Sequence, residues 1–319
     1  MIIKWIYCFS NLYIKIIFGV GNNLTNKFNK QSMGNKIAES WEISANNNGM
    51  SIVKNGELKN KSLKELFGDP KLKKEIFGIK LLNFSEFPIL IKFIDADKNL
   101  SIQVHPNDKL AKKIENSQGK SELWYTMDCK KSSKIICGIK NKRFDLEKNL
   151  YNSNALLDNL NYINIKKGDS IFIKAGTVHA ILEGTLICEI QQNSDITYRI
   201  FDWNRLDIEG KPRDLHISKA KKAINLKNKI KLKHSNFNRI NSRINSNKYF
   251  KTNLLTIKNQ YRDRTNGKTF FAYNVIEGNG IIKNSKQEYI ISCGDSFIVP
   301  ANYGDYIISG NIKLLKTFI

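Results

Sequence analysis

Cysteine is scarce in this sequence and follows no pattern. Five cysteines occur in 319 residues, with neither a Cys-x-x-Cys pair nor the regular spacing of a disulfide framework. Such usage argues against a small secreted domain held together by disulfide bonds, and it favours a reducing compartment. We therefore expect the protein to be cytoplasmic.

The N-terminal stretch lacks the features of an export signal. Residues 1–20, MIIKWIYCFSNLYIKIIFGV, are rich in apolar side chains, but Lys4, Asn11 and Lys15 interrupt them and no small-residue cleavage site follows. A membrane-spanning helix needs about 20 predominantly apolar residues, and a signal peptide needs a cleavage site. We expect a buried first strand here, and no membrane partner.

Acidic residues are also few. Asp and Glu number 29 against 52 Lys and Arg, which gives a formal net charge of +23 at pH 7. Such an excess could serve a nucleic acid, an anionic surface or a phosphorylated substrate. The lysines, however, are spread along the chain without interleaved aromatic residues, among many Asn and Ile. We favour compositional bias and expect no nucleic-acid partner, although a phosphorylated substrate is compatible with the charge.

What the chain does contain is enough apolar material for a core and many short strand patterns. Hydrophobic residues make up 41% and aromatic residues 10% of the chain, which is long enough for one large domain or two ordinary ones. Runs rich in β-branched and aromatic residues alternate with Gly-Asp and Asn-Gly turns. The clearest runs cover residues 87–96, 121–129, 132–139, 169–176 and 184–192. The patterns predict a mainly β fold.

Helical patterns occur at a few positions only. We expect helices in 60–68 and 107–117, each opening with an Asn as N-cap, and in 143–160 and 217–226. The polar, basic segment 227–250 is typical of a connector between two domains, with a nucleic-acid tail as the alternative. A repeat supports two related halves, because Gly168–His179 aligns without a gap with Gly294–Asp305. This repeat predicts a duplicated barrel in which the second copy has lost the histidine.

Histidine is rare, and two of its positions fall in strand-rich stretches. The four histidines are His105, His179, His216 and His234. In a strand, alternate residues share a face, so Gln103 and His105 point to one side. Glu122 begins a strand of bulky apolar residues, where a carboxylate needs a neutralising partner. Two imidazoles and one carboxylate form a set that catalytic zinc commonly uses, and Gln103 could add an amide oxygen.

Each of these residues also has a simpler interpretation. Glu122 could pair with Lys120 on the surface, and His179 could be a hydrogen-bonded core histidine. The metal hypothesis depends on the combination.

Four motifs in this order resemble those of the type I mannose-6-phosphate isomerase family, particularly its short bacterial form. They are Q-V-H-P-N-D (103–108), G-K-S-E-L-W-Y (119–125), G-T-V-H-A (176–180) and E-I-Q-Q-N-S-D-I-T-Y-R (189–199). The resemblance implies two cupin-type jelly-roll β-barrels: residues 1–230 as a metal-binding catalytic domain with helical insertions, and residues 231–319 as a smaller barrel without metal ligands. It also implies a zinc-dependent enzyme that interconverts mannose 6-phosphate and fructose 6-phosphate.

The resemblance further implies roles for single residues. Gln103, His105, Glu122 and His179 are expected to bind one Zn²⁺, and Arg199 is expected to be a catalytic arginine. Glu189, Asp195 and Lys120 fall where the family has site residues. Since the reaction moves a proton between C1 and C2 through an enediol, a base is needed. We expect this base to be Glu189, with the orientation of a metal-bound histidine as its alternative role.

The sequence leaves the roles of other site residues open. Arg199 could serve the enediol or the phosphate group, and we expect Lys120 and Asp195 to contact the sugar phosphate, with an exposed salt bridge as the alternative for Lys120. Rival functions are another metal-dependent cupin enzyme such as a dioxygenase, or an inactive cupin that binds sugars or regulates. We expect a monomer or a homodimer.

Overall fold

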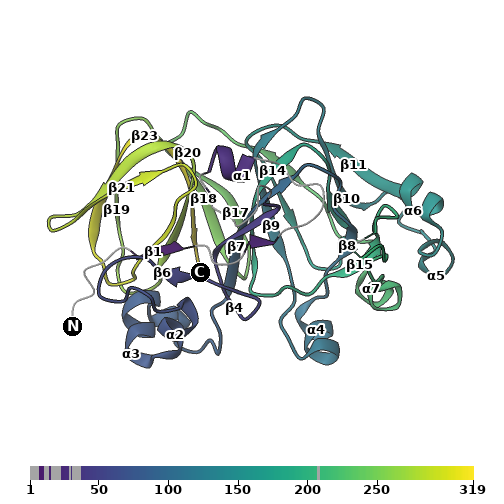
Figure 1. The fold of residues 1–319 in the computed structure, drawn as a ribbon, viewed down its shortest axis with the longest axis horizontal. Coiled ribbons are helices and arrows are strands. Elements are labelled where there is room, and N and C mark those ends of the chain that lie inside the picture. Colours follow the sequence, from purple (N-terminus) through teal and green to yellow (C-terminus); the bar gives the residue numbers. More distant parts are fainter. Residues whose placement is uncertain (1–6, 11–13, 16–22, 29, 31–36, 207–208) are drawn as a thin grey trace. The chain divides into compact units, whose positions relative to one another are not determined.

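The structure is a computed structural model that describes residues 7–10, 14–15, 23–28, 30, 37–206 and 209–319 (Figure 1). The chain divides into two compact units. One contains Ile94–His234, and the other joins the described residues up to Phe93 with Ser235–Ile319. The described residues before Ile94 thus belong with the C-terminal strands, so these units differ in extent from the expected ranges 1–230 and 231–319. The functional division of the chain into those ranges stays a prediction.

The unit of residues 94–234 is built from two antiparallel sheets. One has the order β11-β10-β13-β8-β15, and the other contains β16-β12-β9-β14. The strands are β8 (Ile102–Val104), β9 (Glu122–Cys129), β10 (Lys134–Ile139), β11 (Leu160–Asn164), β12 (Asp169–Ile173), β13 (His179–Ile181), β14 (Thr185–Gln192), β15 (Tyr198–Phe201) and β16 (Leu232–His234). The strand expected in 87–96 is β7 (Ile89–Ala96), all of it buried, and the boundary between the units falls within it.

Alternation along the strands gives the five-stranded sheet two apolar faces. Ile135 and Cys137 of β10 pack into a cluster with Trp124 and Ile171 of the other sheet. Ile136, between them, joins a second cluster that includes residues of α6 (Ser153–Asn159) and α7 (Ile217–Ala223). Because successive side chains of a strand point to opposite faces, one face meets the second sheet and the other is covered by helices. This arrangement creates an interior between the two sheets.

The helices begin where short polar side chains accept backbone N–H groups. Asn107 caps α4 (Asp108–Glu115), as expected. The first helix is different: Ser62, not Asn60, caps α2 (Leu63–Gly68), and Glu65 completes a capping box. Asn60 instead has a positive φ of 71° in the preceding turn. The single helical stretch expected in 143–160 is two helices, α5 (Leu146–Asn149) and α6, because Asn152 caps a new start.

The other unit is dominated by one large sheet. Its order is β17-β18-β23-β20-β22-β1-β6, with β19 paired to β23 and β21 to β20. The strands are β1 (Tyr7–Ser10), β6 (Ile52–Val53), β17 (Asn241–Ser246), β18 (Lys251–Ile257), β19 (Gln260–Arg264), β20 (Phe271–Lys283), β21 (Glu288–Ser292), β22 (Ser296–Val299) and β23 (Asp305–Phe318). The remaining elements of the unit are β2 (Ile14–Lys15), β3 (Glu39–Ile43), β4 (Ala45–Asn46), β5 (Gly49–Met50), α1 (Asn23–Asn26), α3 (Pro70–Leu72), η1 (Lys73–Phe77) and η2 (Ile79–Leu81).

Three sequence predictions concern the first strand, the connector between the two units, and the internal repeat. The first strand lies partly in the described residues, as β1 with Tyr7 and Phe9 buried, while the rest of residues 1–20 apart from β2 lies outside them. The expected connector 227–250 contains the boundary between the units, but it also contributes β16 and β17, so it is not simply a linker. In the repeat, β13 begins at His179 and β23 begins at Asp305, which matches the aligned positions.

Among the described residues, no helix combines the length and the apolar character that a membrane crossing requires.

Candidate metal centre

Strand register brings His179 to Gln103 and His105, although 74 or more residues separate it from them in sequence. Gln103 in β8 lies directly opposite His179 in β13. His105 is the first residue after β8, and its Nε2 atom lies 3.1 Å from Nε2 of His179. The antiparallel pairing of β8 and β13 is therefore the structural reason that these two imidazoles meet.

The carboxylate of Glu122 approaches the same point from the other sheet. Glu122 opens β9, and its two oxygens lie 3.4 Å from Nε2 of His179 and 3.3 Å from Nε2 of His105. All three side chains are buried, and their potential ligand atoms lie within 4.8 Å of one another. The sequence expectation that these three residues share one site in the interior is consistent with this geometry.

Backbone carbonyls select the tautomer of both imidazoles. Nδ1 of His105 lies 2.8 Å from the carbonyl oxygen of Ile196, and Nδ1 of His179 lies 2.8 Å from that of Thr177. A carbonyl oxygen only accepts, so each Nδ1 carries the proton and each Nε2 presents a lone pair to the centre. Histidines that bind metals are typically oriented by such a bond from the other ring nitrogen.

The charge states of the three groups are those that a cation requires. Burial, with a further contribution from Lys120, lowers the pKa of His105 to about 3, and burial lowers the pKa of His179. Burial alone would raise the pKa of Glu122, but Lys120 and the two histidines hold it well below its usual range. Neutral imidazoles and an ionised carboxylate bind metal without first losing a proton.

An unsatisfied oxygen supports the fit to a metal ion. Oε1 of Glu122 is buried and has no hydrogen-bond donor among the residues that the structure describes. A buried carboxylate oxygen without a partner is costly. A divalent cation bound beside the two Nε2 atoms would satisfy this oxygen. The donor set therefore fits a metal ion.

Gln103 lies beside this group but presents its nitrogen. Its Nε2 atom is 3.4 Å from Nε2 of His179, while its Oε1 accepts a hydrogen bond of 3.1 Å from the Ser101 hydroxyl. As a metal ligand it would use the amide oxygen, which a rotation of the amide by about 180° would bring inward.

Lys120 lies inside the site. Its ammonium group is 2.6 Å from Oε2 of Glu122 and 2.8 Å from Nε2 of His105. Lys120 is 4% exposed and Glu122 is fully buried, so the sequence alternative of a surface salt bridge is wrong. A metal ion bound to Glu122 and His105 would compete with this ammonium for the same two acceptor atoms.

Strands β9 and β14 carry further polar side chains close to Glu122. Glu189 lies opposite Trp124, and the indole N–H donates to its Oε2 at 2.8 Å. Oε1 of Glu189 is 3.9 Å from the Lys120 ammonium. Gln191 lies directly opposite Glu122 and is fully buried. Gln191 thus lies on the face that alternation from Glu189 predicts. Sequence reasoning missed Trp124 as a site residue, although alternation from Glu122 could have indicated it.

Arg199 and Asp195 occupy different environments. Arg199 in β15 lies opposite Gln103, and its Nη1 donates to the carbonyl oxygen of Asp214 at 2.7 Å. Burial lowers the pKa of this guanidinium, which remains far above neutrality. Asp195 lies in the loop between β14 and β15 with an exposed side chain, next to Ile196, whose carbonyl holds His105.

Comparison with known proteins covers nearly the whole chain. The family profile "Phosphomannose isomerase type I, catalytic domain" matches residues 7–137, and "Mannose-6-phosphate isomerase, cupin domain" matches residues 240–319. Mannose-6-phosphate isomerase ManA of Bacillus subtilis is 33% identical over 290 residues, covering 89% of this chain and 90% of that protein. The mannose-6-phosphate isomerase of Streptococcus mutans is 31% identical over 306 residues, covering 95% of each.

A solved structure agrees with these sequence matches. The crystal structure of the mannose 6-phosphate isomerase from Bacillus subtilis superimposes with a TM-score of 0.87 at 31% identity, covering 98% of this chain and 99% of that one. Together with the cupin profile, this likeness confirms the expected fold class of a mainly β, cupin-type architecture.

Proposed function

The chain belongs to the type I mannose-6-phosphate isomerase family, and from this premise we propose that it interconverts mannose 6-phosphate and fructose 6-phosphate through an enediol, using a bound zinc ion. The resemblance found in the sequence motifs and the enzyme class expected from it are thereby confirmed. The substrate pair, the metal and the chemical route are the proposal.

One observation carries the proposal. Two imidazole Nε2 atoms 3.1 Å apart, each with its Nδ1 bonded to a backbone carbonyl, face a fully buried carboxylate oxygen that has no donor within the described residues. His105, His179 and Glu122 would hold the ion, with Gln103 as fourth ligand after its amide turns. When bound, the ion supplies a Lewis acid that polarises the carbonyl and hydroxyl oxygens of the sugar.

Zinc is favoured over iron by the ligand set. Two histidines and one carboxylate also suit the iron of a dioxygenase, but an additional amide oxygen closes one of the positions that oxygen chemistry needs. Metal analysis of the purified protein separates the two cases.

Glu189 is proposed as the base that moves the proton between C1 and C2. Its carboxylate is buried in the same interior, and the Trp124 indole holds one oxygen in place at 2.8 Å. The alternative role, orienting a metal-bound histidine, is disfavoured because both Nδ1 atoms already donate to backbone carbonyls. A buried carboxylate held by a neutral donor is suited to accept and return a proton.

Arg199 and Lys120 are proposed to supply positive charge to the substrate. Arg199 keeps its charge at any physiological pH, and its guanidinium is oriented by Asp214. Lys120 donates to Glu122 and His105, and its ammonium would be released towards substrate oxygens when a cation takes those acceptors. Asp195 is retained as a predicted substrate contact.

The test is a coupled isomerase assay on mannose 6-phosphate combined with metal analysis. We expect turnover and about one zinc per chain, loss of turnover after chelation, and recovery on addition of zinc. His105→Ala and His179→Ala should lose zinc and activity together. A protein that turns over at an unchanged rate after complete removal of its metal would contradict the proposal, as would iron in place of zinc.

The cellular context remains predicted. Cytoplasmic location, a monomeric or homodimeric state and the absence of nucleic-acid and membrane partners are expectations from the sequence. An inactive sugar-binding cupin would bind mannose 6-phosphate without converting it, so the same assay separates this rival from the enzyme.

A further inference from the structure

Arg199 lies on the last strand of its sheet, and a segment outside the sheet holds its backbone. The five-stranded sheet ends at β15, so backbone groups of this strand that point away from β8 need other partners. His216 provides two. Its backbone N–H donates to the Arg199 carbonyl oxygen at 2.7 Å, and its Nδ1 accepts the Arg199 N–H at 3.2 Å. One residue thus replaces the neighbouring strand.

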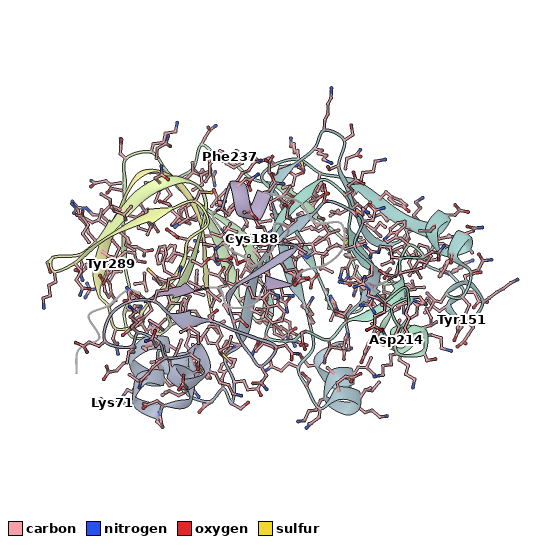
Figure 2. The ribbon with its side chains drawn as sticks, viewed as in Figure 1. Lys71, Tyr151, Cys188, Asp214, Phe237 and Tyr289 are labelled. Atoms are coloured by element: carbon pink, nitrogen blue, oxygen red, sulfur yellow. The ribbon has the colours of Figure 1, made fainter. Side chains whose placement is uncertain are left out.

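The same segment fixes the side chain of Arg199. The carbonyl oxygen of Asp214, a residue labelled in Figure 2, accepts the hydrogen bond from Nη1 of Arg199 at 2.7 Å. Backbone and guanidinium are therefore held by residues 214–216 at three points. We call these three bonds the 214–216 clamp.

The clamp requires a particular form of His216. A backbone N–H can donate to Nδ1 only if Nδ1 has no proton, so the imidazole must be neutral with its proton on Nε2. The charged and titratable groups around it come from four elements: Arg199 of β15, Lys219 of α7, Asp214 of the preceding loop and Glu115 of α4. Burial and the two cations oppose protonation while the two carboxylates favour it, and the pKa of His216 is lowered from 6.5.

We propose that His216 is a positioning residue for the isomerase reaction, and that its neutral imidazole keeps Arg199 directed at the substrate. This inference rests on the proposed function. Protonation of His216 breaks the bond to the Arg199 N–H and places a second positive charge beside the guanidinium. The clamp then loosens once the pH falls below the lowered pKa of His216, without involvement of the proposed metal ligands.

Two substitutions separate this role from a merely structural one. His216→Ala removes the acceptor and should lower kcat about tenfold, since a backbone N–H loses its partner. His216→Asn places an amide oxygen close to the position of Nδ1 and cannot take up a proton there, so kcat at pH 8 should stay within about threefold of wild type. Metal content should be unchanged in both. His234→Asn, at an exposed histidine paired with Asp169, is the matched control.

The pH dependence of kcat in His216→Asn and in the wild type tests the proposal directly. The ratio of kcat for His216→Asn to kcat for wild type should rise as the pH falls through the lowered pKa of His216, because only the wild type loses its clamp. Groups common to both proteins cancel in this ratio. A ratio that stays flat with pH, or an Asn variant as impaired as the Ala variant, overturns the inference.

A spectroscopic readout keeps the clamp testable apart from activity. In ¹⁵N-histidine spectra, the signal that disappears in His216→Asn should show a proton on Nε2 and none on Nδ1 at neutral pH. A proton on Nδ1 overturns the clamp. If the wild-type protein lacks isomerase activity, the proposed function fails and the catalytic role of His216 fails with it, whereas the spectrum still decides whether the clamp exists.

Discussion

Single buried charges in the candidate site depend on one another. Glu122 is fully buried and Lys120 is nearly so, and the Lys120 ammonium donates to Oε2 of Glu122 at 2.6 Å. Removing one member of such a pair leaves an uncompensated charge, so substitutions at Glu122 or Lys120 would disturb folding as well as chemistry. Arg199 and Glu189 offer cleaner tests, since neither forms part of this pair.

Arg199→Ala should abolish most turnover while zinc remains bound. The guanidinium supplies fixed positive charge, and removal of one such group commonly costs about 10²–10³ in kcat. Activity and metal content measured on the same sample check this expectation. Arg262→Ala, on the exposed side of β19, is the control. Wild-type kcat/KM in Arg199→Ala would show that its assigned role is wrong.

Glu189→Gln should lower kcat by about two or more orders of magnitude if this carboxylate is the base. The amide keeps the shape of the side chain, and its oxygen can still accept from the Trp124 indole. The matched control is Glu183→Gln, at an exposed carboxylate in the turn before β14. A loss of only severalfold would exclude Glu189 as the base.

At the scale of elements, the turn between β12 and β13 connects both imidazoles. The Thr177 carbonyl oxygen accepts a hydrogen bond from Nδ1 of His179, and the Gly176 N–H donates to the His105 carbonyl oxygen at 2.8 Å. Gly176 has φ +88°, and a Cβ there would lie 2.8 Å from the carbonyl oxygen of Ala223. Glycine is required at this position by both the backbone conformation and the close approach.

Gly176→Ala should therefore reduce both stability and metal content. We expect a loss of about 1–3 kcal/mol in the free energy of unfolding from backbone strain, with additional displacement of the turn. Urea unfolding and zinc analysis measure the two effects. Gly304→Ala is the matched control, since Gly304 has φ +86° with no atom within 4 Å of the added Cβ. Equal metal loss in both variants would contradict a specific role for the Gly176 turn.

At the scale of the whole molecule, stability is linked to pH through the buried histidines. The folded chain holds His105 with a pKa of about 3 and His179 with a lowered pKa, whereas the unfolded chain titrates both near 6.5. Below pH 6.5 the unfolded state thus binds more protons, and the folded state loses stability as the pH falls. Glu122 acts in the same direction below pH 4.5, because its folded pKa is also depressed.

In the presence of a chelator, the free energy of unfolding should fall between pH 6.5 and pH 5. Each histidine contributes at most about 1.4 kcal/mol per pH unit, so the two together approach twice that slope. Urea unfolding at three pH values measures it. His105→Ala should reduce the slope by about half. If the slope is unchanged in that variant, His105 is not held neutral in the folded protein.

The sequence by itself determined the class of fold and the chemical groups of the site. Alternating apolar residues and glycine turns specify strands locally, since side-chain direction in a strand depends only on position along it. For the same reason, Gln103 with His105, and the odd positions from Glu189 onward, could be assigned to one face in advance. The motifs that carry these residues were also sufficient to identify the family.

The tertiary structure alone decided which of these groups meet. Three contacts depend on strand register and on where the chain folds back. They are the 3.1 Å approach of His105 to His179, the burial of Lys120 against Glu122, and the clamp of His216 on Arg199. The N-terminal β1 pairs with β22, about 290 residues away, for the same reason. Such contacts are fixed by packing of the whole chain, because no local pattern encodes which distant strand becomes a neighbour.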